Sequence, residues 1–417
     1  MSSILKDPGG KGDKKPIRTL AAGWLIDGKG SPALRNSIME IAGGDILAIH
    51  RDCGPAELAR ADVDLSSCTL LPGLCDGHVH LSLSGTEDGG SRKRQLSATF
   101  QEARETIENH LKDHLAHGIV AVRDGGDREG HALQFKRNCL GPDSPVQVFA
   151  AGHAWHMPGR YGAMIGRTPL KEEGLADSIR YNERGDLIKV INSGPNSLSE
   201  FGKETPPQFN LEDLRKAAVC GHSMGLKLMV HANGRLPVKW ALEAGCDSIE
   251  HGYFMGKENL ERMAEKRIPW VPTVFAMNSL CTVLRGAPEA ETAARNVEHQ
   301  LEQIRFAAQC GVVVALGTDS GSVGVHHGKG VIEELKLLMA AGMRLEEAVQ
   351  CATSRVAGLL GLGNLGSLDA GNRAVFIVAQ GDPGQLPGSL NSPQAVFVDG
   401  VPVIYHRTSN ISKSRAQ

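Results

Sequence analysis

Short apolar segments alternate with amphipathic helical segments through the middle of the chain, and this alternation restricts the fold more than any other feature. The segments expected to be strands are residues 71–80, 119–124, 146–151, 187–191, 226–230, 248–249, 269–275 and 312–316. Strands separated by helices pair in parallel, and eight such units are the number that closes a TIM barrel. We therefore predict an α/β fold with a (β/α)8 TIM barrel over residues 69–365.

The segments between these strands carry apolar residues at helical spacing. Between residues 100 and 115 they recur every three or four positions, and Gly118 follows the last of them, which is typical of a helix and its C-terminal end. Pro237 occurs where a proline favours the first turn of a helix. Further helices are expected at residues 210–225, 237–245, 258–266, 289–310, 330–341 and 345–360.

Both ends of the chain have β-strand patterns instead. Residues 17–26 and 37–50 alternate apolar and polar side chains around a Gly43-Gly44-Asp45 turn, and residues 374–378 and 395–403 are rich in β-branched residues with a turn at Asp399-Gly400. We predict one small β-sandwich domain built from residues 17–68 and 366–417. Residues 1–16 are polar, lack the apolar core of a secretory signal, and are predicted to form a disordered tail.

Charge and cysteine content limit the partners. A formal net charge of -2 over 417 residues argues against nucleic acid or an anionic membrane as the main partner. The nine cysteines are scattered without a metal-binding spacing, which favours reduced thiols and a cytoplasmic location. We expect a small-molecule substrate, no nucleic-acid or membrane partner, and leave homo-oligomer formation open.

Candidate metal ligands occur where the predicted strands end. His78 and His80 are two residues apart and therefore project from the same face of a strand. His231, His251 and Asp319 end three other strands, and the C-terminal ends of barrel strands meet at one face. Each alone has a simpler explanation, such as a turn cap for His231 or a helix N-cap for Asp319. Together, their nitrogen and oxygen atoms at the ends of four strands predict a metal site.

Lys189 lies within the apolar strand at residues 187–191. A charged ammonium buried beside a metal would be strongly disfavoured. A neutral amine can instead react with carbon dioxide to give a carbamate, whose two oxygens could bridge two metal ions. The alternative is a lysine that extends out of the strand end or pairs with a carboxylate.

These motifs together resemble the metal-dependent amidohydrolase superfamily, over about residues 17–403. The matching stretches are Pro72-Gly73-Leu74-Cys75-Asp76-Gly77-His78-Val79-His80, Ile188-Lys189 followed by Ser193-Gly194, Val230-His231-Ala232, Ile249-Glu250-His251-Gly252 and Gly317-Thr318-Asp319-Ser320. Within the superfamily the chain looks most like the prolidase-like and imidazolonepropionase-related branch. The stretches that fit this branch are Ala151-Gly152-His153, His327-Gly328, Glu333-Glu334-Leu335 and Ala352-Thr353.

The resemblance implies two divalent metal ions. Zinc suits histidine and carboxylate ligands and is our first choice, but manganese, cobalt and iron suit them too, so the identity of the metal stays open. His78, His80 and Asp319 would bind one ion, and His231 and His251 the other. The resemblance further implies that carboxylated Lys189 bridges them and that Asp319 is the catalytic residue, moving a proton from a metal-bound hydroxide to the leaving amine.

Substrate contacts are less constrained by the sequence. The resemblance makes His153 and Tyr253 candidates, although the first could be a loop histidine and the second could pack at the barrel end. Residues 154–161 form a loop rich in groups that could contact a substrate. Arg160 in this loop and Arg167 shortly after it could bind a carboxylate or could be solvated charges.

The predicted function is hydrolysis of an amide or peptide bond by a binuclear centre, prolidase-like or carboxypeptidase-like, on a dipeptide or an N-acyl amino acid. The alternative is hydrolysis of a cyclic amide or lactone, as in imidazolonepropionase. A mononuclear deaminase is disfavoured because His231 is followed by Ala232-Asn233-Gly234-Arg235, without a carboxylate, and because Lys189 would have no role in it. A non-catalytic descendant is disfavoured because it would have lost ligands.

Overall fold

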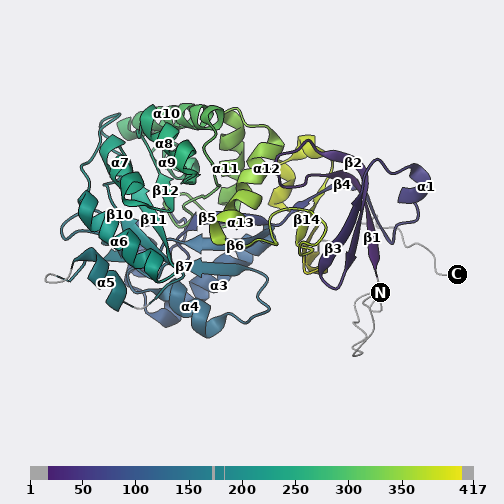
Figure 1. The fold of residues 1–417 in the computed structure, drawn as a ribbon, viewed down its shortest axis with the longest axis horizontal. Coiled ribbons are helices and arrows are strands. Elements are labelled where there is room, and N and C mark those ends of the chain that lie inside the picture. Colours follow the sequence, from purple (N-terminus) through teal and green to yellow (C-terminus); the bar gives the residue numbers. More distant parts are fainter. Residues whose placement is uncertain (1–16, 171–173, 183, 406–417) are drawn as a thin grey trace.

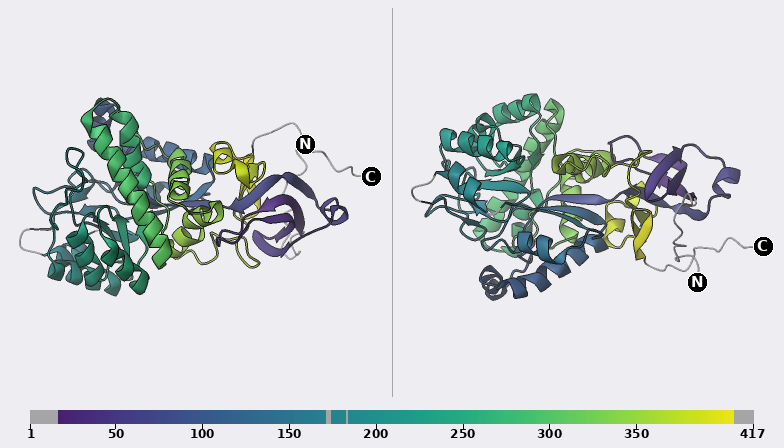
Figure 2. Two further views of the ribbon diagram at one scale, coloured as in Figure 1. Left: turned by 90° about the horizontal axis from the view of Figure 1, so that it is seen from above. Right: turned by 60° about the horizontal axis from the view of Figure 1, so that its bottom comes forward.

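The computed structural model describes residues 17–170, 174–182 and 184–405, so the predicted tail at residues 1–16 lies outside the described residues. Figure 1 shows a body of strands and helices joined to a second, strand-rich part, and the two further views in Figure 2 show the same division. Among the described residues, no helix combines the length and the apolar character needed to cross a membrane.

The strand-rich part is a seven-stranded sheet built from both ends of the sequence, in the order β16-β15-β14-β4-β1-β2-β3. Its strands are β1 (Arg18–Leu25), β2 (Leu34–Ala42), β3 (Asp45–His50), β4 (Val63–Pro72), β14 (Phe376–Gln380), β15 (Ala395–Val398) and β16 (Val401–Tyr405). Antiparallel pairing of β14 with β4 joins the two ends of the chain. The Gly43-Gly44 turn was predicted correctly, whereas the short helix α1 (Pro55–Leu58) was not expected.

In the body, every strand pair among the described residues is parallel. One sheet has the order β5-β6-β7 and the other the order β13-β12-β11-β10-β8-β9. Their bounds are β5 (Leu74–Val79), β6 (Ile119–Asp124), β7 (Gln147–Ala150), β8 (Ala154–Trp155), β9 (Gly166–Arg167), β10 (Leu187–Ile191), β11 (Lys227–Ala232), β12 (Ser248–His251) and β13 (Trp270–Val271). The expected parallel α/β architecture is confirmed.

Helices lie outside these strands (Figures 1 and 2). They are α2 (Gly89–Leu96), α3 (Phe100–Ala116), α4 (His131–Cys139), α5 (Leu175–Tyr181), α6 (Leu211–Ser223), α7 (Arg235–Ala244), α8 (Lys257–Lys266), α9 (Val274–Val283), α10 (Pro288–Cys310), α11 (Lys329–Ala340), α12 (Leu345–Ala352) and α13 (Ser354–Leu360). Thr99 and Asn210 cap α3 and α6, each accepting a hydrogen bond from the third helical N–H. On α3, Ala103, Ile107 and Leu111 are buried, as their spacing predicts.

Two predicted elements differ from the structure. The strand expected over residues 269–275 ends at Val271, because Thr273 adopts a left-handed conformation and the Glu334 carboxylate accepts hydrogen bonds from the first N–H groups of α9. The helix expected over residues 345–360 is divided at Thr353, whose φ of -124° and ψ of -98° are not helical.

The expected last strand, residues 312–316, forms only an isolated bridge between Val314 and Trp270. Its neighbours are nevertheless those of a strand between β13 and β5. Trp270 N–H donates to Val313 O (2.9 Å) on one side, and Gly77 N–H donates to Leu316 O (2.9 Å) on the other. A Cβ on Gly77 would lie 2.7 Å from Leu316 O, so glycine permits this close approach. Residues 312–320 thus lie between the two ends of the parallel sheets.

Candidate active site

The residues expected to bind metal converge at the C-terminal ends of the strands. His78 Nε2 lies 3.5 Å from Asp319 Oδ1, and His80 Nε2 lies 3.4 Å from the same oxygen. Ligand atoms of these three residues all lie within 4.8 Å of one another. The ring centroid of His251 lies 5.0 Å from that of His78 and 4.5 Å from that of His231.

Each of the four imidazoles is oriented through one ring nitrogen. His78 Nδ1 bonds to Glu250 Oε2 (2.8 Å) and His80 Nδ1 to Gly126 O (2.8 Å). His251 Nδ1 bonds to Thr273 Oγ1 (2.7 Å), and His231 Nε2 bonds to Gly194 O (3.2 Å). Such contacts fix the tautomer and leave the opposite nitrogen to bind a cation.

Burial keeps most of these rings neutral. Burial, with a smaller contribution from nearby Lys189, lowers the pKa of His78 to about 4 and that of His231 to about 3. The pKa of His251 also falls well below its usual value, through burial and through His231. His80 differs: burial lowers its pKa, but the hydrogen bond to Asp319 and the charges of Asp319 and Asp124 together outweigh burial and raise the pKa. A metal needs the unprotonated nitrogen, so neutral rings are the form that can bind.

Lys189 lies in the middle of β10 and is only 1% exposed. Its Nζ lies 3.3 Å from His78 Nε2. Burial lowers its pKa to about 8, against the opposing influence of Glu250 and Asp319. The neutral amine is therefore much more accessible here than in an exposed lysine.

Asp319 has a φ of +59°, which is uncommon for a residue other than glycine. Its Oδ2 accepts a hydrogen bond from Ser322 Oγ (2.9 Å). Burial opposes ionisation, but the nearby histidines His80 and His78 hold the pKa of Asp319 well below its usual range. His251 (φ +66°) also has a positive φ, and unusual backbone of this kind gathers at functional sites.

A buried ion pair between Glu250 and Arg123 contacts the site through His78, and it was not predicted from the sequence. Glu250 Oε1 accepts hydrogen bonds from Arg123 Nη2 (2.8 Å) and Ser248 Oγ (2.5 Å), while Oε2 binds His78. Arg123 also donates from Nε to Gly77 O (2.7 Å). The sequence does contain a signal for this pair, because Arg123 and Glu250 are oppositely charged residues within otherwise apolar strands.

Two further buried carboxylates fix the connecting backbone. Asp76 accepts hydrogen bonds from Thr318 N–H (3.0 Å) and Thr318 Oγ1 (2.6 Å), which tie β5 to the segment carrying Asp319. Asp124 accepts from Leu81 N–H (2.7 Å) and Gly126 N–H (2.8 Å), and thereby places the carbonyl that orients His80.

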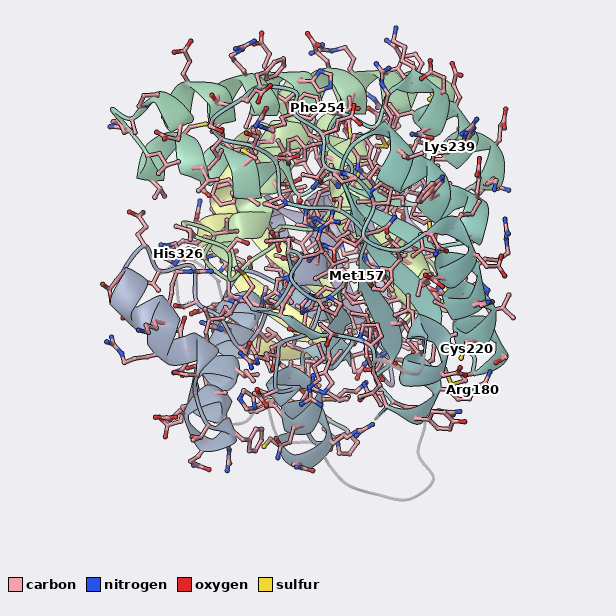
Figure 3. The ribbon with its side chains drawn as sticks, turned by 90° about the vertical axis from the view of Figure 1, so that its left-hand side faces the viewer. Met157, Arg180, Cys220, Lys239, Phe254 and His326 are labelled. Atoms are coloured by element: carbon pink, nitrogen blue, oxygen red, sulfur yellow. The ribbon has the colours of Figure 1, made fainter. Side chains whose placement is uncertain are left out.

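A pocket opens over the converging side chains. It is lined by His78, His80, Leu83, Arg92, Tyr161, Met164, Ile165, Lys189, His231, His251, Asp319, Gly321 and Ser322. The Tyr161 ring lies 5.4 Å from the His231 ring. In Figure 3, which views the side opposite the terminal sheet, Met157 lies near the centre of the face, whereas Arg180, Cys220 and Lys239 lie toward its edge.

This pocket is not lined by any of the four candidate substrate contacts, His153, Tyr253, Arg160 and Arg167. His153 is buried, and its Nδ1 lies 3.2 Å from Asp127 O. Tyr253 is buried, and its hydroxyl has no hydrogen-bond partner among the described residues. Arg160 is exposed and donates to Pro206 O (2.9 Å). Sequence reasoning had also missed Arg92, which does line the pocket. The substrate roles of His153, Tyr253 and Arg160 stay predictions.

The residues present suit divalent cations. Imidazole nitrogens and a carboxylate are ligands that zinc, manganese, cobalt and iron accept. The four imidazole rings are neutral or, for His80, paired with Asp319. In each ring, one nitrogen is hydrogen-bonded to a protein group, as described above, and the other is left to bind a cation. The His78, His80 and Asp319 cluster is therefore a candidate metal site.

Comparison with known proteins agrees with this geometry. The Amidohydrolase family model matches residues 69–404. Ochratoxinase from Aspergillus niger is 26% identical over 384 residues, covering 82% of this chain and 76% of the relative. Imidazolonepropionase from Geobacillus thermodenitrificans is 25% identical over 379 residues, covering 83% and 82%. A solved Xaa-Pro dipeptidase with bound methionine superposes with a TM-score of 0.77 at 25% identity, covering 93% of this chain and 99% of that one.

The family match extends over most of the sequence and contains every strand end that carries a candidate ligand. The chain belongs to the amidohydrolase family and is a hydrolase that acts on carbon–nitrogen bonds.

Proposed function

We propose that the protein hydrolyses the amide bond of a dipeptide or an N-acyl amino acid at a binuclear metal centre. The observation that carries the proposal is the convergence of four oriented imidazoles, Lys189 and Asp319 on one pocket. His78, His80 and Asp319 would hold one ion, and His231 and His251 the other. Zinc suits this set of nitrogen and oxygen ligands.

Lys189 would bridge the two ions as a carbamate. Its neutral amine adds to carbon dioxide, an N–C bond forms, and one proton leaves to solvent, which converts the side chain into an anion with two oxygens. The buried position and lowered pKa support this chemistry. A carbamate would also remove the unfavourable burial of a cation beside metal ions.

Asp319 would act as the proton carrier. The bound cations would supply a Lewis acid for the scissile carbonyl and lower the pKa of a bound water. The depressed pKa of Asp319 keeps its carboxylate ionised, and the ionised form is the one that could take up a proton and then give it to the leaving amine. Ser322, bonded to Oδ2, would hold that carboxylate in place.

We infer that residues 69–365 form a closed TIM barrel and that residues 17–68 and 366–405 form a separate β-sandwich domain; residues 406–417, which the sequence prediction added to this domain, lie outside the described residues. Hydrogen bonds from residues 312–320 to both Trp270 and β5 support the closure. The closed arrangement would hold β5, β10, β11 and β12 at fixed spacing, which a site made from several strand ends requires.

The similarity to a Xaa-Pro dipeptidase and to ochratoxinase supports an amide or peptide substrate. The similarity to imidazolonepropionase supports a second candidate, hydrolysis of a cyclic amide or lactone. A mononuclear deaminase has less support, since it would leave Lys189 without a role.

The test is turnover of a substrate panel by protein purified without chelator and analysed for metal. The panel contains Xaa-Pro and other dipeptides, N-acetyl amino acids, cyclic amides and lactones, with products resolved by chromatography. We expect dipeptide or N-acyl amino acid cleavage, and a loss of about 100-fold or more in kcat for Asp319→Asn. Metal-loaded protein that cleaves no linear amide would refute the proposal, and an Asp319→Asn variant as active as the wild type would refute the role of that residue.

A further inference from the structure

The pocket contains one cationic side chain besides Lys189 and the histidines, namely Arg92 of α2. It is half-buried, in contrast to its neighbours Lys93 and Arg94, which are exposed. Asp88 caps α2 by accepting a hydrogen bond from Ser91 N–H (2.7 Å), and this fixes the start of the helix that carries Arg92.

The Arg92 guanidinium is held from one side only. Its Nη1 donates to Gly321 O (2.9 Å) and to Ser84 O (3.2 Å), so it is anchored between the loop after β5 and the loop that follows Asp319. Among the described residues, no hydrogen bond joins Nε or Nη2 of Arg92 to another group. These remaining donors have the planar arrangement that binds a carboxylate through two parallel hydrogen bonds.

Apolar side chains line the same pocket as Arg92 and the metal-site residues. Leu83, Met164, Ile165 and the ring of Tyr161 line the same pocket. A ligand in the pocket therefore meets candidate metal ligands, apolar surface and a guanidinium. That combination suits an amide whose amine portion carries an apolar side chain and an anionic group.

We propose that Arg92 binds the free carboxylate of the substrate and so restricts the enzyme to amides of α-amino acids with a free C-terminus. The inference rests on the proposed amide hydrolysis and adds the group that selects among amides. It assigns the carboxylate to Arg92 instead of Arg160, which is exposed and bonded to Pro206 O. If Lys189 is a carbamate, Arg92 is the remaining permanent cation among the described residues that line the pocket.

The experiment compares each accepted substrate with the same molecule in which the C-terminal carboxylate is a carboxamide. Wild type, Arg92→Gln, Arg92→Lys and the matched control Arg94→Gln are assayed, and release of the C-terminal product is followed by chromatography. Arg94 lies on the same helix but is exposed and donates to Ser91 Oγ (2.7 Å). Calorimetric binding of leucine, phenylalanine, methionine and proline, and of their amides, gives a readout that needs no turnover.

We expect Arg92→Gln to lower kcat/KM for the carboxylate substrate by about 10- to 100-fold, which is the loss of one or two charge-assisted hydrogen bonds. The carboxamide should change by less than about threefold, Arg92→Lys should retain part of the activity, and Arg94→Gln should match the wild type. Binding of the free amino acids should weaken in the same variants, while binding of the amides should not.

Equal losses for carboxylate and carboxamide would show that Arg92 only tethers the two loops, and would overturn the inference. A wild-type preference for carboxamides would overturn it too, while leaving amide hydrolysis intact. If no amide is cleaved, the proposed function fails. The calorimetric arm then decides about Arg92 on its own, because unchanged binding of free amino acids to Arg92→Gln refutes its role.

Discussion

Replacing Glu250 by glutamine tests whether the buried ion pair of Glu250 and Arg123 stabilises the fold and orients His78. The exchange keeps the size of the side chain but removes the charge opposite Arg123, which has Nη2 2.8 Å from Glu250 Oε1. It also changes the partner of His78 Nδ1 from a carboxylate to an amide. The amide N–H can donate a hydrogen bond to Nδ1, which would favour the tautomer with the ring proton on Nε2, the nitrogen that faces Asp319.

The structure sets the size of the effect. Burial would raise the pKa of Glu250, but Arg123 and His78 outweigh it and lower the pKa from 4.5 to about 2. A shift of that size corresponds to about 3 kcal/mol of folding free energy at neutral pH. Leaving a buried cation without its partner costs about 3–5 kcal/mol, so both arguments give the same order. We expect Glu250→Gln to lose about 3 kcal/mol or more.

The assay is denaturant unfolding of metal-free protein at pH 7, beside metal affinity measured by competition with a chelating dye. The affinity should fall by about 10- to 100-fold, since a partner that orients a ligand is lost. The matched control is Glu108→Gln, because Glu108 is exposed on α3 and bonds only at the surface to Lys112 (2.9 Å). This control should keep the wild-type unfolding midpoint and metal affinity.

The pH dependence gives a second check on Glu250. Its pKa is lower in the folded state, so its stabilisation is fully present above about pH 4.5 and disappears as the pH falls toward 2. The difference in stability between wild type and Glu250→Gln should therefore shrink in that range. A loss below about 1 kcal/mol at pH 7 with unchanged metal affinity would show that the ion pair neither stabilises the fold nor orients His78.

Two further substitutions test separate parts of the site. A Cβ on Gly125 would lie 2.9 Å from His80 Cε1, so Gly125→Ala should displace the His80 ring and weaken metal binding about tenfold. The control is Gly141→Ala, because a Cβ at Gly141 would meet open space and should leave metal binding unchanged. Equal metal affinities of the two variants in a dye-competition assay would contradict this prediction. Burial raises the pKa of Glu334 to about 8, so its contribution to stability should be lost as the pH rises from about 4.5 through 8. Thermal unfolding of Glu334→Gln across that range should lack this loss, and curves parallel to the wild type would refute the assignment.

The sequence pattern predicted most of the parallel strands because their signals are local. Residues 187–191 are a short apolar run, and the structure forms β10 over the same residues. The positions of His78, His80, His231 and His251 followed from strand periodicity and from the common direction of parallel strands. These four rings and Asp319 do line one pocket.

What the sequence pattern did not predict depends on partners distant in the chain. Glu250 and Arg123 are 127 positions apart, and neither segment alone shows that the other neutralises it. The start of α9 was mistaken for strand because Val274 and Phe275 favour strands, while Glu334, 60 positions after Val274, caps them as a helix.

Arg92 shows a different limit. It lies on α2, none of whose residues is buried, so apolar periodicity gave no sign of the helix. Its position in the pocket comes from two backbone carbonyls, Ser84 O and Gly321 O, that only the folded chain brings together.

The most direct test of the central claim is a crystal structure of the protein grown with zinc and bicarbonate, without chelator. We expect two ions among His78, His80, His231, His251 and Asp319, with electron density for a carbamate beyond Lys189 Nζ in contact with both. A single ion, or a bare amine at Lys189 beside a loaded site, would contradict it.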